Sequence, residues 1–141
     1  AADAARSMRG HPKIDVAAAR AVLRGRCPPP LLILQGDRDG VIDARNAEHL
    51  AALWLAAHPA ADDGATIAPR SIRTQQRGTR HPMRITDWST PSAARGRMPY
   101  VRLVHIEGLG HAWSGGAARQ AFSDPKGPDA LKLAWQFFSK P

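Results

Sequence analysis

Two short apolar runs, each followed directly by a loop that contains glycine, constrain the fold of this chain more than any other feature. The first, Leu31–Leu34, is apolar throughout, which is typical of a strand buried on both faces of a sheet. The loop after it carries the acids Asp37 and Asp39. The second run, Tyr100–Ile106, predicts another strand, and the loop after it carries His111. The chain is therefore expected to present an acid and a histidine at two strand ends.

Helical patterns flank these runs. A helix is expected after the capping residue Asp15, a second from Asp43 until Pro59, and a third that begins at Gly127-Pro128-Asp129 with Pro128 in its first turn. Met83–Trp88 predicts a further short strand. Strands that alternate with helices predict a mostly parallel sheet flanked by helices on both faces. Two or three strands are too few to complete such a sheet, so additional sequence or a partner is expected.

The size and composition fit one domain or a large piece of one. The chain has 141 residues and is 43% apolar, without an apolar run long enough to predict a membrane span. From about residue 60 to 99 it is polar, rich in arginine and interrupted by glycine and proline, which predicts a long surface excursion. The single cysteine, Cys27, excludes an internal disulfide and is expected to be a small buried thiol.

The net charge of +8 is concentrated in one segment. Arg70–Arg102 contains eight arginines and one acid, Asp87. Such a segment raises the question of nucleic acid or another polyanion as a ligand. Aromatic residues that could stack on bases are scarce there, because only Trp88 and Tyr100 occur.

The two loops hold the residues best suited to chemistry. An acid can orient an imidazole and stabilise its protonated form, while the imidazole exchanges a proton with a serine. Asp39 lies deeper in its loop than Asp37 and is the preferred acid, although a turn or an Asx cap is the simpler role for either. A calcium loop is not expected, because the twelve-residue pattern ending in Glu is absent. The glycines around His111 leave its imidazole uncrowded, which makes it the preferred base.

Three further expectations concern the surroundings of His111. Trp113 can line a substrate pocket, with a partly buried anchor as its alternative role. Ser114 is not expected to be the nucleophile, because it lacks the strand-to-helix elbow and is better placed to bond its own loop. No metal site is expected, since no histidines have zinc spacing. The nucleophile motif Gly-x-Ser-x-Gly does not occur in these 141 residues.

Several of these runs resemble the C-terminal half of the polyhydroxybutyrate depolymerase-like esterases, which are α/β-hydrolases related to feruloyl and acetylxylan esterases. The similarity covers nearly the whole chain, and Gly108–Gly116, with the sequence Gly-Leu-Gly-His-Ala-Trp-Ser-Gly-Gly, is its most specific part. The other matching runs are Leu32–Ile42, Asp124–Ala130 and Trp135–Phe138. The resemblance implies that residues 1–141 form the C-terminal part of one α/β-hydrolase domain, without the N-terminal half that bears the nucleophile.

The resemblance also implies an activity, with Asp39 as the acid and His111 as the base of a serine carboxylic ester hydrolase. The chain alone is then expected to be inactive, because the serine and the oxyanion hole lie elsewhere. The expected ligand is a small or polymeric ester, without a cofactor, and neither a membrane nor nucleic acid is an expected partner. The resemblance is compatible with a secreted or periplasmic location, and a homo-oligomer is left open.

Two alternatives remain at this point. The first is a basic binding module without catalysis, in which Arg70–Arg102 binds nucleic acid or another polyanion; arginine outnumbers lysine 16 to 4, which suits phosphate binding. The second is a degenerate hydrolase fold retained as an interaction domain.

Overall fold

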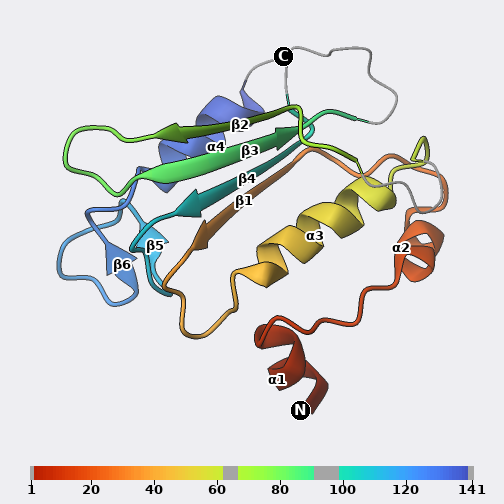
Figure 1. The fold of residues 1–141 in the computed structure, drawn as a ribbon, viewed down its shortest axis with the longest axis horizontal. Helices are drawn as coiled ribbons and strands as arrows, with labels where there is room; N and C mark the ends of the chain where they lie inside the picture. The colour runs from red at the N-terminus through yellow and green to blue at the C-terminus, as the bar shows by residue number, and fades with distance from the viewer. Residues whose placement is uncertain (1, 62–66, 91–98, 140–141) are drawn as a thin grey trace.

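A four-stranded mixed sheet is the framework of the computed structural model, which describes residues 2–61, 67–90 and 99–139 (Figure 1). The strand order is β1-β4-β3-β2. β1 and β4 are parallel, whereas β3 is antiparallel to both of its neighbours. The strands are β1 (Leu31–Gly36), β2 (Ser71–Gln75), β3 (Met83–Trp88) and β4 (Val101–Ile106).

The expectation of a mostly parallel α/β-hydrolase sheet is wrong, because only the β1–β4 pair is parallel. β2 and β3 form a hairpin inside the segment expected to be an irregular excursion, and the antiparallel β3 occupies the second edge of β4. A short connection reverses the chain directly, whereas a parallel neighbour would need a long crossover. Gly78, at φ +55, lies in this connection. β2 has one aliphatic residue, the exposed Ile72, so no apolar pattern revealed it.

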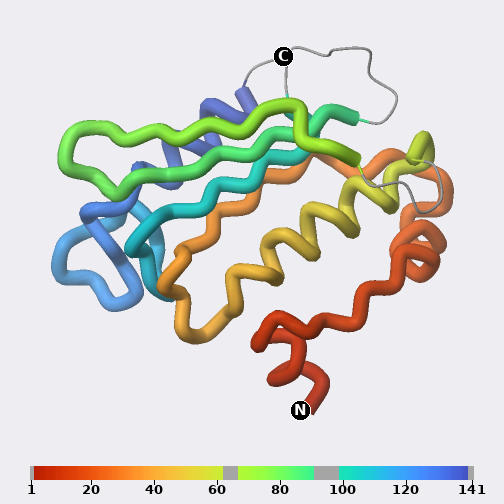
Figure 2. Tube along the Cα trace, viewed as in Figure 1, coloured from red at the N-terminus to blue at the C-terminus, as the bar shows by residue number. Residues whose placement is uncertain are grey.

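Helices cover both faces of the sheet (Figures 1 and 2). α3 (Arg45–Ala56) packs Ala51 and Leu55 against the start of β4, together with Tyr100 and Val101. On the other face, α4 (Ala130–Phe138) contributes Leu133 to a cluster formed around β3 and β4. The buried members of that cluster are Met83, Ile85, Val104, Ile106 and Leu109. The sheet therefore separates two apolar layers, and the β1–β4 pair runs between the two helices.

The helix starts follow local capping chemistry. The carboxylate of Asp15 accepts a hydrogen bond from Ala18 N at 2.8 Å at the start of α2 (Val16–Leu23). Asp129 caps α4 in the same way through Lys132 N, at 2.9 Å. The cap expected at Asp43 is displaced by one residue, since Ala44 is the N-cap of α3 and has no capping side chain. These caps satisfy backbone N–H groups that a first helical turn leaves without partners.

β1 lies at an edge of the sheet, and both of its faces are covered, since Leu32 and Leu34 pack on one apolar cluster and Leu31 and Ile33 on the other. Leu31, Leu32, Ile33 and Leu34 are each only partly buried. Within the described residues, β1 pairs with β4 alone, so its other edge has no neighbouring strand to cover it. Cys27, in the segment before β1, is exposed, and the expectation of a buried thiol is wrong.

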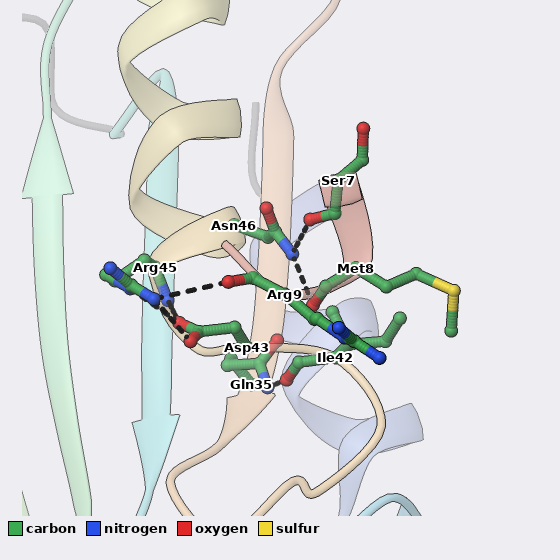
Figure 3. Close-up of polar contacts among 8 residues, drawn as sticks. All are labelled: Ser7, Met8, Arg9, Gln35, Ile42, Asp43, Arg45 and Asn46. Atoms are coloured by element: carbon green, nitrogen blue, oxygen red, sulfur yellow. Dashed lines mark hydrogen bonds and ion pairs between the residues drawn. The ribbon is translucent and has the colours of Figure 1, made fainter. Parts of the chain in front are cut away.

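The N-terminal segment docks against the start of α3 (Figure 3). Asn46 Nδ2 donates to the carbonyl of Ser7 at 2.8 Å, and Arg45 Nη2 donates to the carbonyl of Arg9 at 3.2 Å. Asp43 N donates to Met8 O at 2.8 Å. The preceding helix, α1 (Ala2–Met8), buries no residue. These contacts anchor the end of the loop between β1 and α3.

None of the described helices is long and apolar enough to cross a membrane.

Candidate functional site

The site lies where the carboxyl ends of the parallel strands β1 and β4 meet. Residues 37–42 follow β1 and are called the acid loop, and residues 107–115 follow β4 and are called the base loop. Parallel strands bring the loops at their carboxyl ends to the same edge of a sheet. The acid loop carries Asp39 and the base loop carries His111, which are 72 residues apart in sequence.

Asp39 and His111 are in direct contact. Asp39 Oδ2 lies 3.0 Å from His111 Nδ1. The carboxylate side chain is 10% exposed, whereas the imidazole is 48% exposed. Of the two acids considered from the sequence, the structure thus brings Asp39, and not Asp37, to the histidine.

The acid loop prepares Asp39 for this contact. Its Oδ1 accepts hydrogen bonds from Val41 N at 2.9 Å and Ile42 N at 2.8 Å, which leaves Oδ2 for the imidazole. Partial burial acts to raise the pKa of Asp39, but the hydrogen bonds from Ile42, His111 and Val41 outweigh it and lower that pKa. The carboxylate is therefore ionised at neutral pH and can only accept, so Nδ1 of His111 carries the hydrogen. Nε2 is then the nitrogen that can take up a proton, as a base requires.

Backbone contacts hold the two loops together. Asp37 N donates to Ile106 O at 3.1 Å, and Arg38 N donates to Leu109 O at 3.0 Å. Gly36 is required here, because a Cβ at this position would overlap the carbonyl group of Leu109. The close approach of the two backbones fixes where Asp39 can meet the base loop.

Asp37, the second acid of the loop, has a different partner. Its Oδ1 accepts a hydrogen bond from Gly108 N at 2.7 Å, at the beginning of the base loop. An ionised carboxylate that accepts from a backbone N–H forms a stronger hydrogen bond than a neutral acceptor. The two acids thus differ in their partners, since Asp37 binds the backbone of the base loop and Asp39 binds the imidazole of His111.

A hollow of about 340 Å³ adjoins the Asp39–His111 pair. Trp113, predicted from the sequence as a lining residue, borders it and is 60% exposed. Its other lining residues include Leu34, Leu109, Ala112, Phe122 and Ala130. The hollow is therefore largely apolar, with one carboxylate and one imidazole at its wall, which is the composition expected of a small-molecule site.

Sequence reasoning missed Phe122, which lies beside the candidate base. Its ring meets the imidazole of His111 edge to face at a centroid distance of 6.4 Å. The side chain is 76% exposed, and the backbone has φ +54, in the left-handed region that bulky residues rarely adopt. Phe122 O accepts from Trp113 N at 2.7 Å, so the two aromatic residues are coupled. No apolar periodicity surrounds Phe122 in the sequence, so no signal distinguished it.

Ser114 is excluded as a nucleophile by its contacts. The residue is buried, and its hydroxyl donates to the carbonyl of Pro128 at 2.6 Å. Among the described residues, it is the only serine that lines the hollow. In the described part of the chain, the hollow is thus lined by a paired carboxylate and imidazole, without a serine whose hydroxyl is free.

Several arginines of the basic segment have structural partners. Arg102 Nε and Arg73 Nη1 donate to the carboxylate of Asp87 at 2.6 and 2.7 Å, across β2, β3 and β4. Burial acts to raise the pKa of Asp87, but the two arginines outweigh it and lower that pKa. Arg80 donates to the carbonyl of Gly127 at 2.6 Å. Arg95 and Arg97 lie outside the described residues. A ligand-binding surface would therefore have fewer free guanidinium groups than the sequence suggested.

Among the described residues, no group of three or more His, Cys, Asp or Glu side chains is placed so that it could hold a metal ion. The remaining histidines have other surroundings. His58 is buried beside Tyr100, and His105 lies on β4. His81 pairs with Asp124 at 3.0 Å, which the sequence did not indicate.

No model of a known protein family matches the chain, and no curated protein matches it significantly.

Proposed function

We propose that this chain contributes the acid and the base of a serine-type carboxylic ester hydrolase. The observation that carries the proposal is the 3.0 Å contact between Asp39 Oδ2 and His111 Nδ1 at the wall of an apolar hollow. In this arrangement the carboxylate orients the imidazole, and Nε2 takes a proton from a serine hydroxyl and returns it to the leaving alcohol. The depolymerase-like esterases that the sequence resembles use an acid and a base in these two loops.

The serine and the oxyanion donors are proposed to come from outside the 141 residues. The nucleophile motif is absent from the sequence, and the hydroxyl of Ser114 is bonded to the backbone. The Asp39–His111 pair polarises a serine only when one is brought within about 3 Å of Nε2. The chain alone is therefore expected to hydrolyse esters no faster than a His111→Ala variant of itself.

The test uses the longest polypeptide that the gene encodes, assayed with short aryl esters. His111→Ala is expected to lower kcat by about 10⁴-fold or more, and Asp39→Asn by about 10⁴-fold, since losing either partner removes the oriented base. His11→Ala is the matched control, because His11 is exposed and distant from the hollow in sequence. Full esterase activity in His111→Ala would overturn the proposal.

A further inference from the structure

The imidazole of His81 lies against the beginning of the base loop. Gly108 has φ +79, and a Cβ on it would come within 3.2 Å of His81 Cε1 and Nδ1. The ring therefore packs directly on the glycine backbone. Next to this contact, Glu107 N donates to the carbonyl of Pro82 at 2.9 Å. The start of the base loop is thus held by the segment that leads into β3.

The same imidazole reaches the end of the base loop through Asp124. His81 Nε2 lies 3.0 Å from Asp124 Oδ2, and the carbonyl of Asp124 accepts from Gly115 N at 2.8 Å. Asp124 Oδ1 accepts from Lys126 N at 2.8 Å, which fixes the carboxylate. Burial acts to raise the pKa of Asp124, but the hydrogen bonds from Lys126 and His81 outweigh it and lower that pKa. The carboxylate is therefore ionised at neutral pH, and His81 Nε2 donates to it.

Neither residue of this second pair borders the hollow beside Asp39 and His111. His81 and Asp124 are each 23% exposed, and His81 N also donates to the carbonyl of Lys126 at 2.8 Å. The pair therefore joins three segments. These are the connection between β2 and β3, the base loop, and β6 (Ser123–Asp124), which pairs in parallel with β5 (Trp113–Ser114). Because His81 joins the two ends of the base loop from outside the hollow, it can fix the orientation of His111 without contacting a substrate.

We infer that His81, through Asp124, is a positioning residue for the candidate base His111. A loop held at both ends has fewer conformations, so the imidazole of His111 spends more time in the orientation that meets Asp39. The catalytic meaning of this inference rests on the proposed function, whereas the coupling between His81 and His111 does not.

The test is nuclear magnetic resonance of the 141-residue chain, labelled uniformly with nitrogen-15 so that both imidazole and backbone amide signals are observed. In the unmodified chain, the Nδ1–H proton of His111 is expected to give a resolved signal because Asp39 protects it from exchange with water. His81→Ala is expected to broaden or abolish that signal and to speed amide hydrogen exchange at Gly115 by about tenfold or more. His81→Gln is expected to restore both readouts, because its amide nitrogen can donate to Asp124 as Nε2 does.

Leu55→Ala is the matched control, since it opens a cavity under α3 on the opposite face of the sheet. It is expected to lower the unfolding midpoint while the His111 signal persists. If His81→Ala does not fold, Asp124→Asn replaces it, because the amide keeps the shape but weakens the bond to the imidazole.

An unchanged His111 signal in the folded His81→Ala or Asp124→Asn variant would overturn the inference. An equal loss of signal in Leu55→Ala would also overturn it, because the effect would then follow stability alone. Failure of the proposed function gives a different result. If His111→Ala keeps full esterase activity, the proposed function is wrong, but the effect of His81→Ala on the His111 and Gly115 signals is unchanged. In the complete polypeptide, His81→Ala is expected to lower kcat about 10-fold to 100-fold with KM nearly unchanged.

Discussion

Gly36 shows how one residue without a side chain decides whether Asp39 and His111 can come into contact. It ends β1 at the point where the backbone of Leu109 crosses it. Immediately afterwards, Asp37 N bonds to Ile106 O at the end of β4, and Arg38 N bonds to Leu109 O in the base loop. A larger residue would push the two strand ends apart, and Asp39 would move with the acid loop. The sequence marks this glycine only as part of a turn, so its packing role was not predictable from local pattern.

Gly36→Ala is therefore expected to destabilise the chain by about 1–3 kcal/mol and to weaken the contact between Asp39 and His111, because the backbone must shift to admit the methyl group. Gly40→Ala is the matched control, since a Cβ there meets nothing within 4 Å and φ is not in the left-handed region. It is expected to change stability by less than about 0.5 kcal/mol. Urea unfolding of the two variants measures the difference, and equal midpoints would contradict the overlap at Gly36.

At the scale of the element, α4 has large apolar side chains on two faces, of which one packs on the sheet and the other is exposed to solvent. Phe137 is 4% exposed and lies under the guanidinium of Arg102, with 5.6 Å between the guanidinium carbon and the ring centroid. Phe138 is 61% exposed, and Leu131 and Trp135 share its outward position. The apolar spacing of the helix, which includes Leu131, Trp135 and Phe138, predicted Trp135 and Phe138 as core residues, and this is wrong. The structure buries the side that carries Ala130 and Phe137, because both faces of α4 carry large apolar residues.

The neighbouring phenylalanines of α4 provide a direct comparison. Phe137→Ala is expected to cost about 3–5 kcal/mol in free energy of unfolding, because it leaves a cavity between α4 and the sheet. Phe138→Ala is expected to cost less than about 1 kcal/mol, since the ring is largely in solvent and loses mainly its edge contact with Phe137. Urea or thermal unfolding of both variants tests the assignment, and the reverse order of stabilities would mean that α4 is rotated.

The β2–β3 hairpin is the element that sequence reasoning placed least well. Met83–Trp88 was predicted as a strand and is confirmed, but β2 was not foreseen. Only Ile72 in β2 is aliphatic, and the strand is held instead by its register with β3 and by the contact of Arg73 with Asp87. Pairing with β3 and the ion pairs around the buried Asp87 overrode weak local preference there.

Across the whole molecule, the response to acid follows from groups that are buried or bonded in the folded state. Burial lowers the pKa of His58 from its ordinary 6.5, and it is the main cause of the lower pKa of His105. The unfolded chain then takes up these protons at a higher pH than the folded chain does, so stability falls as the pH drops below about 6.5. The lowered pKa values of Asp39, Asp87 and Asp124 have a separate effect: their stabilisation is present above about pH 4 and is lost at lower pH.

The expected result is a fall in the urea midpoint between pH 8 and pH 5.5, followed by a steeper fall toward pH 3. His58→Gln should reduce the first fall without removing it, because His105 still contributes. The matched control is His11→Gln, which replaces an exposed histidine and is expected to retain the first fall, because His58 and His105 are both still present. A midpoint that is constant from pH 8 to pH 5.5 would show that the buried histidines do not govern this range.

The sequence by itself determined the two apolar strands, the helix that starts after Asp15, the presence of a helix after Gly127, and the carboxylate and imidazole best suited to form a pair. These features are local, because apolar runs, capping side chains and glycines act on their immediate neighbours along the chain. Only the tertiary structure showed that Asp39, the acid preferred from the sequence, contacts His111, that β3 lies antiparallel to β4, and that Phe122 and the His81–Asp124 pair surround the base loop. Each of these depends on strand pairing or on contacts across folded loops, whose partners local sequence patterns do not specify.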